Sequence, residues 1–131
     1  MEMIHIMTRH PESIGWNDSL ETARQMMEAG GFRRLPVTRN GEVIGMLTER
    51  DLRQHRGYLE STKVSAAMSS GLISVGPNTT VPEAARLMVK HKIGGIPVLE
   101  NGKLVGIVTT IDMLGAFLEV IEEFHKKQGP L

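Results

Sequence analysis

The sequence predicts a mixed α/β (α+β) fold built from two copies of one β-α-β-β-α unit. Three observations predict it: the chain matches itself at an offset of 61 residues, each copy contains an apolar pattern of helical period, and each copy has an Asn-Gly pair between two strand-like runs. A chain of 131 residues has the length of one ordinary domain or of two very small ones. A unit of about fifty residues would be marginally stable alone, so we expect the copies to pack together.

The internal repeat pairs residues 7–52 with residues 68–113 without a gap. Thirteen of these 46 pairs are identical, and about a third of the others exchange like for like, such as Leu35 with Ile96 and Ile44 with Val105. The runs "VIGMLTERD" (43–51) and "LVGIVTTID" (104–112) both contain Gly-x-x-Thr-x-x-Asp. Chance does not keep register over such a length, so we divide the chain into a first repeat, residues 1–61, and a second, residues 62–131.

Each repeat opens with a short extended piece, "ESIG" (12–15) or "LISVG" (72–76), followed by a polar turn and a helix. Ser19 is placed as N-cap of the first helix, and Thr80 with Glu83 predicts a capping box at the start of the second. Helical spacing of the apolar residues follows, and in the first repeat they are Leu20, Ala23, Met26 and Met27. The helices are expected to end at Gly30-Gly31 and at His91-Lys92.

A β-hairpin follows in each repeat. The runs "RLPVT" (34–38) and "GIPVL" (95–99) predict brief strands, and Asn40-Gly41 or Asn101-Gly102 is the strongest short hairpin signal. The second strands, "EVIGMLT" (42–48) and "KLVGIVT" (103–109), show little polar surface, so we expect them to be buried on both faces. A second helix begins at the threonine that ends each strand.

Composition excludes several classes of function. Fifteen basic and fifteen acidic residues cancel, which gives no sign of a nucleic-acid or membrane partner, and there is no cysteine for disulfides or thiolate chemistry. No apolar run approaches the roughly 20 residues of a membrane span, so we expect a soluble, cytoplasmic protein. The five histidines lack metal-ligand spacing, and no Ser/His/Asp arrangement or phosphate loop is present. We therefore expect no metal site and no enzyme.

The repeated Thr-x-x-Asp allows two interpretations. A threonine that opens a helix lies among free backbone N–H groups at the positive end of the helix dipole, where its hydroxyl could bind a phosphate or ribose oxygen. The aspartate three residues later lies on the same face and has two acceptor oxygens, which suit the two hydroxyls of a ribose. Thr-x-x-Asp is also a plain capping box, and the two roles are compatible.

The runs "GFRRLPVTRNGEVIGMLTERDL" (31–52) and "KIGGIPVLENGKLVGIVTTIDM" (92–113) resemble the CBS domain, a family that occurs in tandem pairs. Each run follows a capped helix and a Met-Thr or Met-Ser dipeptide, and the resemblance covers residues 3 to about 116. It implies a module with pseudo-twofold symmetry and two clefts between the repeats. Many members bind AMP, ADP, ATP, S-adenosylmethionine or sometimes NAD there, regulate an attached or partner protein, and form homodimers. Of these ligands, AMP is our first expectation, and no cofactor is required.

The resemblance also assigns site residues. It implies that Thr48, Asp51, Thr109 and Asp112 bind ribose and phosphate, and that Arg33 and Arg34 reach a phosphate. Gly94 and Gly95 take the corresponding positions in the second repeat and depart from that pattern, which puts a second phosphate site in doubt. The wall against base and ribose is expected near Thr8, Ser13, Ser69 and Ser74.

The tail predicts a helical extension over about residues 115–128. Phe117, Ile121 and Phe124 form an apolar stripe, and Gly129-Pro130 ends the helix. The stripe either packs on its own module or contacts a partner. For the whole chain, the main alternative to a nucleotide sensor is a ligand-free dimerisation or scaffolding module. A regulatory piece of an enzyme or transporter encoded elsewhere is a further one.

Overall fold

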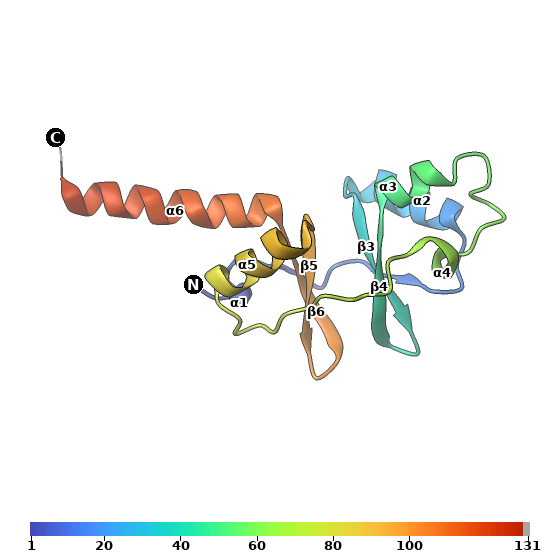
Figure 1. Ribbon diagram of the computed structural model, residues 1–131, viewed down its shortest axis with the longest axis horizontal. Helices are drawn as coiled ribbons and strands as arrows, with labels where there is room; N and C mark the ends of the chain where they lie inside the picture. The colour runs from blue at the N-terminus through green and yellow to red at the C-terminus, as the bar shows by residue number, and fades with distance from the viewer. Residues whose placement is uncertain (130–131) are drawn as a thin grey trace. The chain divides into compact units, whose positions relative to one another are not determined.

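The computed structural model describes residues 1–129, and Pro130 and Leu131 lie outside the described residues. The strands form two three-stranded sheets, in the orders β1-β6-β5 and β2-β3-β4. Figure 1 shows the β3–β4 and β5–β6 hairpins of these sheets. The mixed fold class predicted from the sequence is confirmed. In chain order the elements are α1 (Met3–Ile6), β1 (Thr8–Arg9), β2 (Ile14–Gly15), α2 (Leu20–Gly30), β3 (Arg34–Arg39), β4 (Glu42–Thr48), α3 (Glu49–Gln54), α4 (Val64–Ala67), α5 (Val81–His91), β5 (Gly95–Glu100), β6 (Lys103–Thr109) and α6 (Thr110–Gln128).

The elements gather into two compact units. One contains Met1–His10, Ile73–Glu100 and the chain from Val105 onward, and the other contains Pro11–Leu72 with the turn Asn101–Leu104. The first ten residues therefore pack with the body of the second repeat, and the segment before residue 73 packs with the body of the first. The compact units do not coincide with residues 1–61 and 62–131. The mutual pseudo-twofold packing of the repeats remains a prediction.

The unit built on the first repeat has β2 parallel to β3 and β3 antiparallel to β4. Asn40 and Gly41 both have positive φ, at 52° and 82°, which confirms the predicted hairpin turn. The core lies between the sheet and the helices α2, α3 and α4. Its buried members are Ile14, Leu20, Ala23, Met27, Leu35, Val37, Leu47, Leu52 and Val64.

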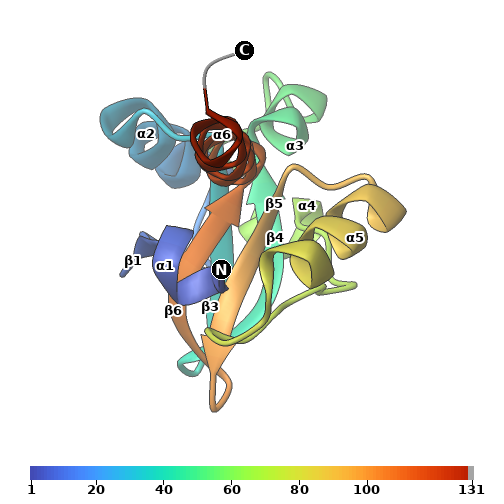
Figure 2. The same ribbon diagram turned by 90° about the vertical axis from the view of Figure 1, so that its left-hand side faces the viewer.

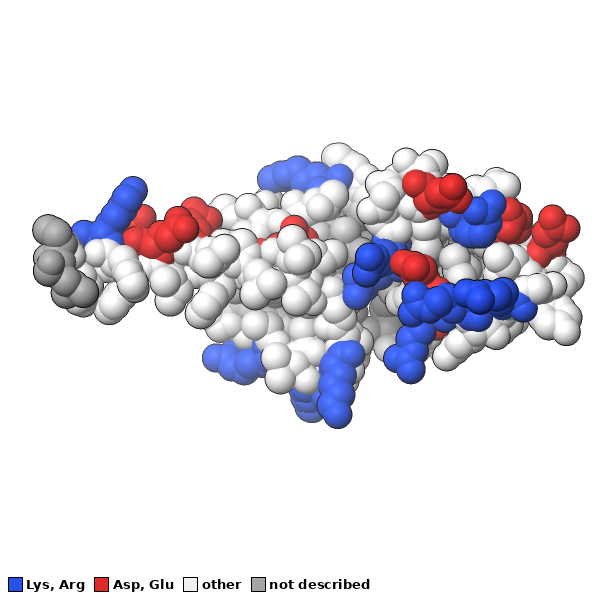
Figure 3. Space-filling model, turned by 90° about the horizontal axis from the view of Figure 1, so that it is seen from above, with Lys and Arg blue, Asp and Glu red and all other residues white. Residues whose placement is uncertain are grey.

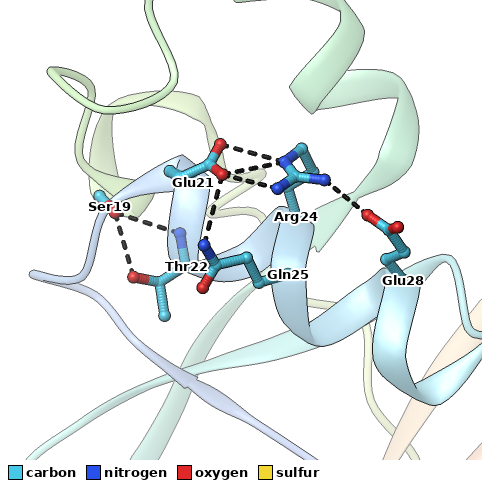
Figure 4. A network of polar contacts seen from close by, with 6 residues as sticks. All are labelled: Ser19, Glu21, Thr22, Arg24, Gln25 and Glu28. Carbon is cyan, nitrogen blue, oxygen red and sulfur yellow. Dashed lines mark hydrogen bonds and ion pairs between the residues drawn. The ribbon is translucent and has the colours of Figure 1, made fainter.

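Helix α2 is fixed at both ends as the sequence predicts. The Ser19 hydroxyl accepts a hydrogen bond of 3.1 Å from the Thr22 N–H, and Gly31 ends the helix in the left-handed conformation. On its outer side Arg24 pairs with Glu21 at 2.7 Å and with Glu28 at 2.6 Å (Figure 4). The Arg24 guanidinium holds the pKa of Glu21 below its usual value.

The unit built on the second repeat repeats this plan. Helices α1 and α5 lie beside the β5–β6 hairpin (Figure 2). Lys92 ends α5 in the left-handed conformation with φ 54°. Strand β1 pairs antiparallel with β6, so that Thr8 lies opposite Ile107. The buried core residues are Met3, Val75, Ala84, Met88, Ile96, Val98 and Val108.

Several local predictions were wrong. Residues 72–76 form no strand but a single parallel bridge from Val75 to Val98. Strand β4 alternates: Val43, Gly45 and Leu47 are buried, whereas the residues between them remain half-exposed, so it is not buried on both faces. The capping box of α5 is incomplete because the Glu83 carboxylate accepts from the Thr80 hydroxyl rather than from its backbone N–H. The short helices α1 and α4 and the strand β1 were not predicted.

Helix α6 runs through the whole predicted extension and ends at Gln128. α1 and α5 contact it, and Met113 packs on the core of its unit, but Ala116 is its one buried residue. Phe117, Ile121 and Phe124 are exposed, so they do not pack on their own module. No helix among residues 1–129 is both long and apolar enough to cross a membrane.

Candidate functional site

Strand β4 ends at Thr48, which is also the N-cap of helix α3, and hydrogen bonds run in both directions between Thr48 and Asp51. The Thr48 N–H donates to Oδ2 of Asp51 at 2.8 Å, and its hydroxyl donates to the same oxygen at 3.0 Å. The Asp51 N–H donates back to Oγ1 of Thr48 at 3.3 Å. The predicted capping box is confirmed.

The same cap recurs where β6 becomes α6. The Thr109 N–H and hydroxyl donate to Oδ2 of Asp112 at 2.8 and 3.1 Å, and the Asp112 N–H donates to Oγ1 of Thr109 at 3.4 Å. Sequence identity at these positions therefore reflects identical local geometry. All four side chains are partly exposed rather than buried.

The hydrogen-bonding groups that each cap leaves free for a ligand differ from those expected from the sequence. The threonine hydroxyl already donates its proton to the aspartate, so it has only a lone pair to offer. The N–H groups of Glu49 and Thr110 donate to the carbonyls of Arg33 and Gly94 at 2.9 and 3.0 Å, so the helix starts offer fewer free donors than expected. Oδ1 of Asp51 and of Asp112 receives no hydrogen bond from any described residue. The free group at each cap is a carboxylate oxygen held at a fixed position.

The glycine three residues before each capping threonine, Gly45 or Gly106, permits a close approach of another part of the chain. A Cβ at Gly45 would stand 2.5 Å from the Ser69 carbonyl oxygen and 3.0 Å from the Met68 sulfur, and a Cβ at Gly106 would overlap the Met7 side chain. The Met68-Ser69 and Met7-Thr8 dipeptides can therefore lie against β4 and β6 only because Gly45 and Gly106 lack a side chain.

The two predicted phosphate ligands lie differently. Arg34 is the direct cross-strand partner of Thr48 in the β3–β4 ladder, so the two side chains share a sheet face, with Cβ atoms about 5 Å apart. Arg33 is 81% exposed and its Nε lies 3.5 Å from Oε2 of Glu49. The structure therefore brings Arg34, but not Arg33, to the Thr48–Asp51 cap. Gly94 and Gly95 supply no side chain at the other cap.

The four residues of the expected base and ribose wall divide into two kinds. Thr8 and Ser69 lie opposite Ile107 and Met46, two residues before the capping threonines on β6 and β4. They thus lie two residues along the strand from the caps of the units to which they belong. Ser13 and Ser74 precede the parallel partners of β3 and β5, on the other side of each hairpin from the cap.

Sequence reasoning missed the exchange of the leading segments between the repeats. Met7 and Met68 are identical in the repeat, as are Gly45 and Gly106 against which they lie. Both repeats keep a methionine at one position and a glycine at the other, and this shared pairing was the signal from which the exchange could have been predicted. It concerns residues far apart in sequence, which no local pattern connects.

Comparison with known proteins agrees with this architecture. A family model described as the CBS domain matches the chain twice, over residues 3–57 and 64–119. The chain is 33% identical over 110 residues to the CBS domain-containing protein YhcV of Bacillus subtilis, with 82% of this chain and 79% of that protein covered. The family resemblance found in the sequence is confirmed.

Two solved structures with bound ligands have the same fold. CBSX2 in complex with AMP matches with a TM-score of 0.81 at 23% identity, covering 91% of this chain and 97% of that chain. The CBS domain pair of protein MJ0100 in complex with 5'-methylthioadenosine and S-adenosyl-L-methionine matches with a TM-score of 0.80 at 22% identity, covering 89% and 95%. At these identities the likeness establishes the fold alone.

Proposed function

Because this chain belongs to the CBS domain family and carries two of its domains in tandem, we propose that it is a regulatory module that binds an adenosine-containing nucleotide at its Thr–Asp caps. Occupancy is signalled to a partner protein, and the module works as a homodimer in the cytoplasm. No catalytic step and no cofactor are part of this function. AMP is the first candidate ligand, followed by ADP, ATP and S-adenosylmethionine.

The observation that carries the proposal is the state of two carboxylates, those of Asp51 and Asp112, each of which has one oxygen bonded within its cap and one oxygen free. In each cap the backbone and hydroxyl of the threonine fix Oδ2 of the aspartate, while Oδ1 has no partner among the described residues. An ionised oxygen held in this way can accept a hydrogen bond from a ribose hydroxyl without a further loss of side-chain freedom.

Two further observations support a nucleotide. Arg34 lies beside the Thr48–Asp51 cap and can pair with a phosphate. CBSX2 was crystallised with AMP, and the MJ0100 domain pair with S-adenosyl-L-methionine and 5'-methylthioadenosine, which makes adenosine compounds the ligands to test first.

Thermal unfolding of the full chain against AMP, ADP, ATP, S-adenosylmethionine and NAD tests the proposal. A ligand at a hundredfold its dissociation constant adds about 2.7 kcal/mol to the free energy of unfolding. For a domain of this size that raises the midpoint by about 10 °C. We expect at least one adenosine compound to do so, with inosine and guanosine monophosphates as controls. If no ligand of the panel raises the unfolding midpoint, and calorimetry at millimolar ligand detects no binding, the nucleotide-sensing function is overturned.

A ligand-free scaffolding module is the second candidate. The exposed apolar residues of α6 favour it, since they offer a protein contact that needs no small molecule. A flat ligand panel together with stable self-association would select this alternative. If the chain instead regulates an enzyme or transporter encoded elsewhere, a nucleotide response should change the activity of that partner.

A further inference from the structure

Helix α6 carries most of the large apolar side chains that the described chain exposes. Seven of the ten are on this helix: Ile111, Leu114, Phe117, Leu118, Val120, Ile121 and Phe124. The other repeat helices offer little, because α2 and α3 contribute none and α5 contributes Val89. Among the helices of the described chain, α6 therefore offers the largest exposed apolar surface for a homodimer contact.

These residues are arranged for contact with another helix. Ile111, Leu114, Leu118 and Ile121 are spaced by three, four and three residues, the spacing of a coiled-coil seam, and we call them the α6 stripe. Phe117 and Phe124 flank the stripe on one side. Met113 and Ala116, which pack toward the unit that carries α6, lie on a different face of the helix. The α6 stripe is thus turned away from its own core.

We propose that the α6 stripe pairs with the α6 stripe of a second copy of this chain, in antiparallel orientation. The inference rests on the homodimer of the proposed function and assigns its interface. Covering the α6 stripe and the two flanking phenylalanines on both copies would bury on the order of 1,000 Å², close to the lower limit of specific protein interfaces. A stripe with its own heptad spacing is complementary to itself, so an identical helix fits it without any other partner.

The charges of α6 select the orientation. Glu119, Glu122 and Glu123 are followed by Lys126 and Lys127, and within the described chain none of these five forms an ion pair. Figure 3 shows acidic side chains along α6 ahead of basic ones near its end. A parallel pair would set the two acidic segments side by side, where they repel. An antiparallel pair that overlaps the stripes sets Ile111 beside Ile121 of the second copy. Each acidic segment then lies near the start of the other helix, where the dipole is positive and Asp112 is the one acidic residue of the first turn, so that three glutamates face one carboxylate instead of three.

The same charges disfavour a lipid surface. A helix that lies on an anionic membrane has lysine and arginine on its polar face, whereas α6 presents three glutamates before its two lysines. A second copy therefore fits the helix better than a membrane does.

Sedimentation of the full chain at tens of micromolar tests the interface. We expect a dimer, and we expect Leu118→Glu to raise the dissociation constant by roughly 100-fold or more, because an unpaired charge would be buried in the contact. Leu118 is 57% exposed, so the monomer should fold, as circular dichroism will show. Val89→Glu is the matched control: Val89 is 78% exposed on α5, and its variant should remain a dimer.

A monomeric parent chain, or a Leu118→Glu variant that remains as dimeric as the parent, would overturn the proposal. The second result would leave nucleotide binding untouched, since ligand response is measured separately. Binding of the parent to phosphatidylserine vesicles that Leu118→Glu abolishes, without any dimer in solution, would also overturn it.

Cysteine cross-linking tests the orientation, because the natural chain has no cysteine. Ile111→Cys mixed with Ile121→Cys should form a mixed disulfide dimer, recognised by a mass tag on one of them. Gln128→Cys alone should not cross-link, since antiparallel helices of about 28 Å keep their ends apart. Efficient Gln128→Cys dimers without the mixed product would show a parallel pair and overturn the antiparallel arrangement.

Discussion

Arg34 lies directly opposite Thr48 across the β3–β4 ladder, whereas the matching position of the second repeat is Gly95. The neighbouring Arg33 is already engaged with Glu49, which also pairs with Arg53 at 3.2 Å. The two Thr–Asp caps therefore have the same hydrogen bonds but different electrostatic surroundings. If the caps bind nucleotides, a cation should assist phosphate binding at the Thr48–Asp51 cap alone.

Replacing Arg34 with alanine should remove most of the preference for AMP over adenosine. A charged hydrogen bond contributes about 1.5–3 kcal/mol, so AMP affinity should fall by about tenfold or more, while adenosine affinity stays nearly unchanged. In the parent the preference should shrink as salt is raised, because ions screen a partly exposed pair. Isothermal titration with both ligands at two salt concentrations measures these differences.

Arg33→Ala is the control for that experiment, since it removes the same charge one residue away. Its preference for AMP should remain close to that of the parent, because the Arg33 side chain points to Glu49. The assignment of Arg34 fails if both single variants, or the double variant, still prefer AMP as strongly as the parent chain does.

Asp51→Asn and Asp112→Asn should each weaken nucleotide binding while the fold remains intact. Asparagine retains one acceptor oxygen for the cap, but the negative charge and the free second oxygen are lost. Losing this partner of the ribose should cost about 1.5–3 kcal/mol of binding free energy. Calorimetric titration gives the affinity, and the midpoint of thermal unfolding shows whether the cap persists. If both variants bind as tightly as the parent, the carboxylates are caps and have no further role.

Local chemistry made much of the fold predictable. Asn40-Gly41 specifies its turn because both residues tolerate positive φ, and Ser19 specifies a helix start because its hydroxyl replaces a missing acceptor. The Thr-x-x-Asp caps were predictable for the same reason. In each case residues within four positions of one another determine the structure, so one sequence is sufficient to recognise it.

The remaining features depend on residues far apart in the chain. Strand β1 has two residues and pairs with β6, almost a hundred positions away, so no local pattern marks it. The choice between Arg33 and Arg34 depended on strand register, because a shift of one residue exchanges the two sheet faces. The exposure of the α6 stripe could not be predicted either, since an apolar helical pattern looks the same whether its own core or another molecule covers it.

The Glu21–Arg24 pair should make stability depend on pH in the acid range. Its hydrogen bonds from Arg24 lower the pKa of Glu21 in the folded state. A lowered folded pKa contributes stability that is present above the unfolded pKa of about 4.3 and is lost as pH falls through the folded pKa. The difference in unfolding midpoint between the parent and Glu21→Gln should therefore be positive at pH 7 and should shrink below about pH 4.

Thermal unfolding between pH 7 and pH 2.5 measures that difference. The control is the same substitution in an Arg24→Ala background, where the main partner is missing and the pH dependence of the difference should become smaller, with the Gln25 amide still bonded to Glu21. A difference that stays constant down to pH 2.5 would show that the pair does not contribute to folding through its charge.

Alanine at Gly45 should destabilise the chain through a backbone contact. The new Cβ would stand 2.5 Å from the Ser69 carbonyl oxygen, and that oxygen accepts a hydrogen bond of 3.0 Å from the Met46 N–H. The segment cannot move away without weakening this bond, so we expect a loss of about 1–3 kcal/mol in the free energy of unfolding, measured in urea. Gly115→Ala is the control: nothing lies within 4 Å of its Cβ, and alanine in α6 should stabilise by up to about 1 kcal/mol.

Gly106→Ala tests why these strands contain glycine. Either the segment that contains Met7 approaches the strand too closely for a side chain, or the strand backbone itself requires glycine. Here the new Cβ meets the Met7 side chain, which is flexible and can be shortened. Met7→Ala should therefore recover part of the stability lost in Gly106→Ala, whereas Met68→Ala should recover little in Gly45→Ala, because the Ser69 carbonyl remains. Equal recovery in both repeats would mean that the methionines alone set the spacing. No recovery in either would mean that the glycines act through the strand backbone itself.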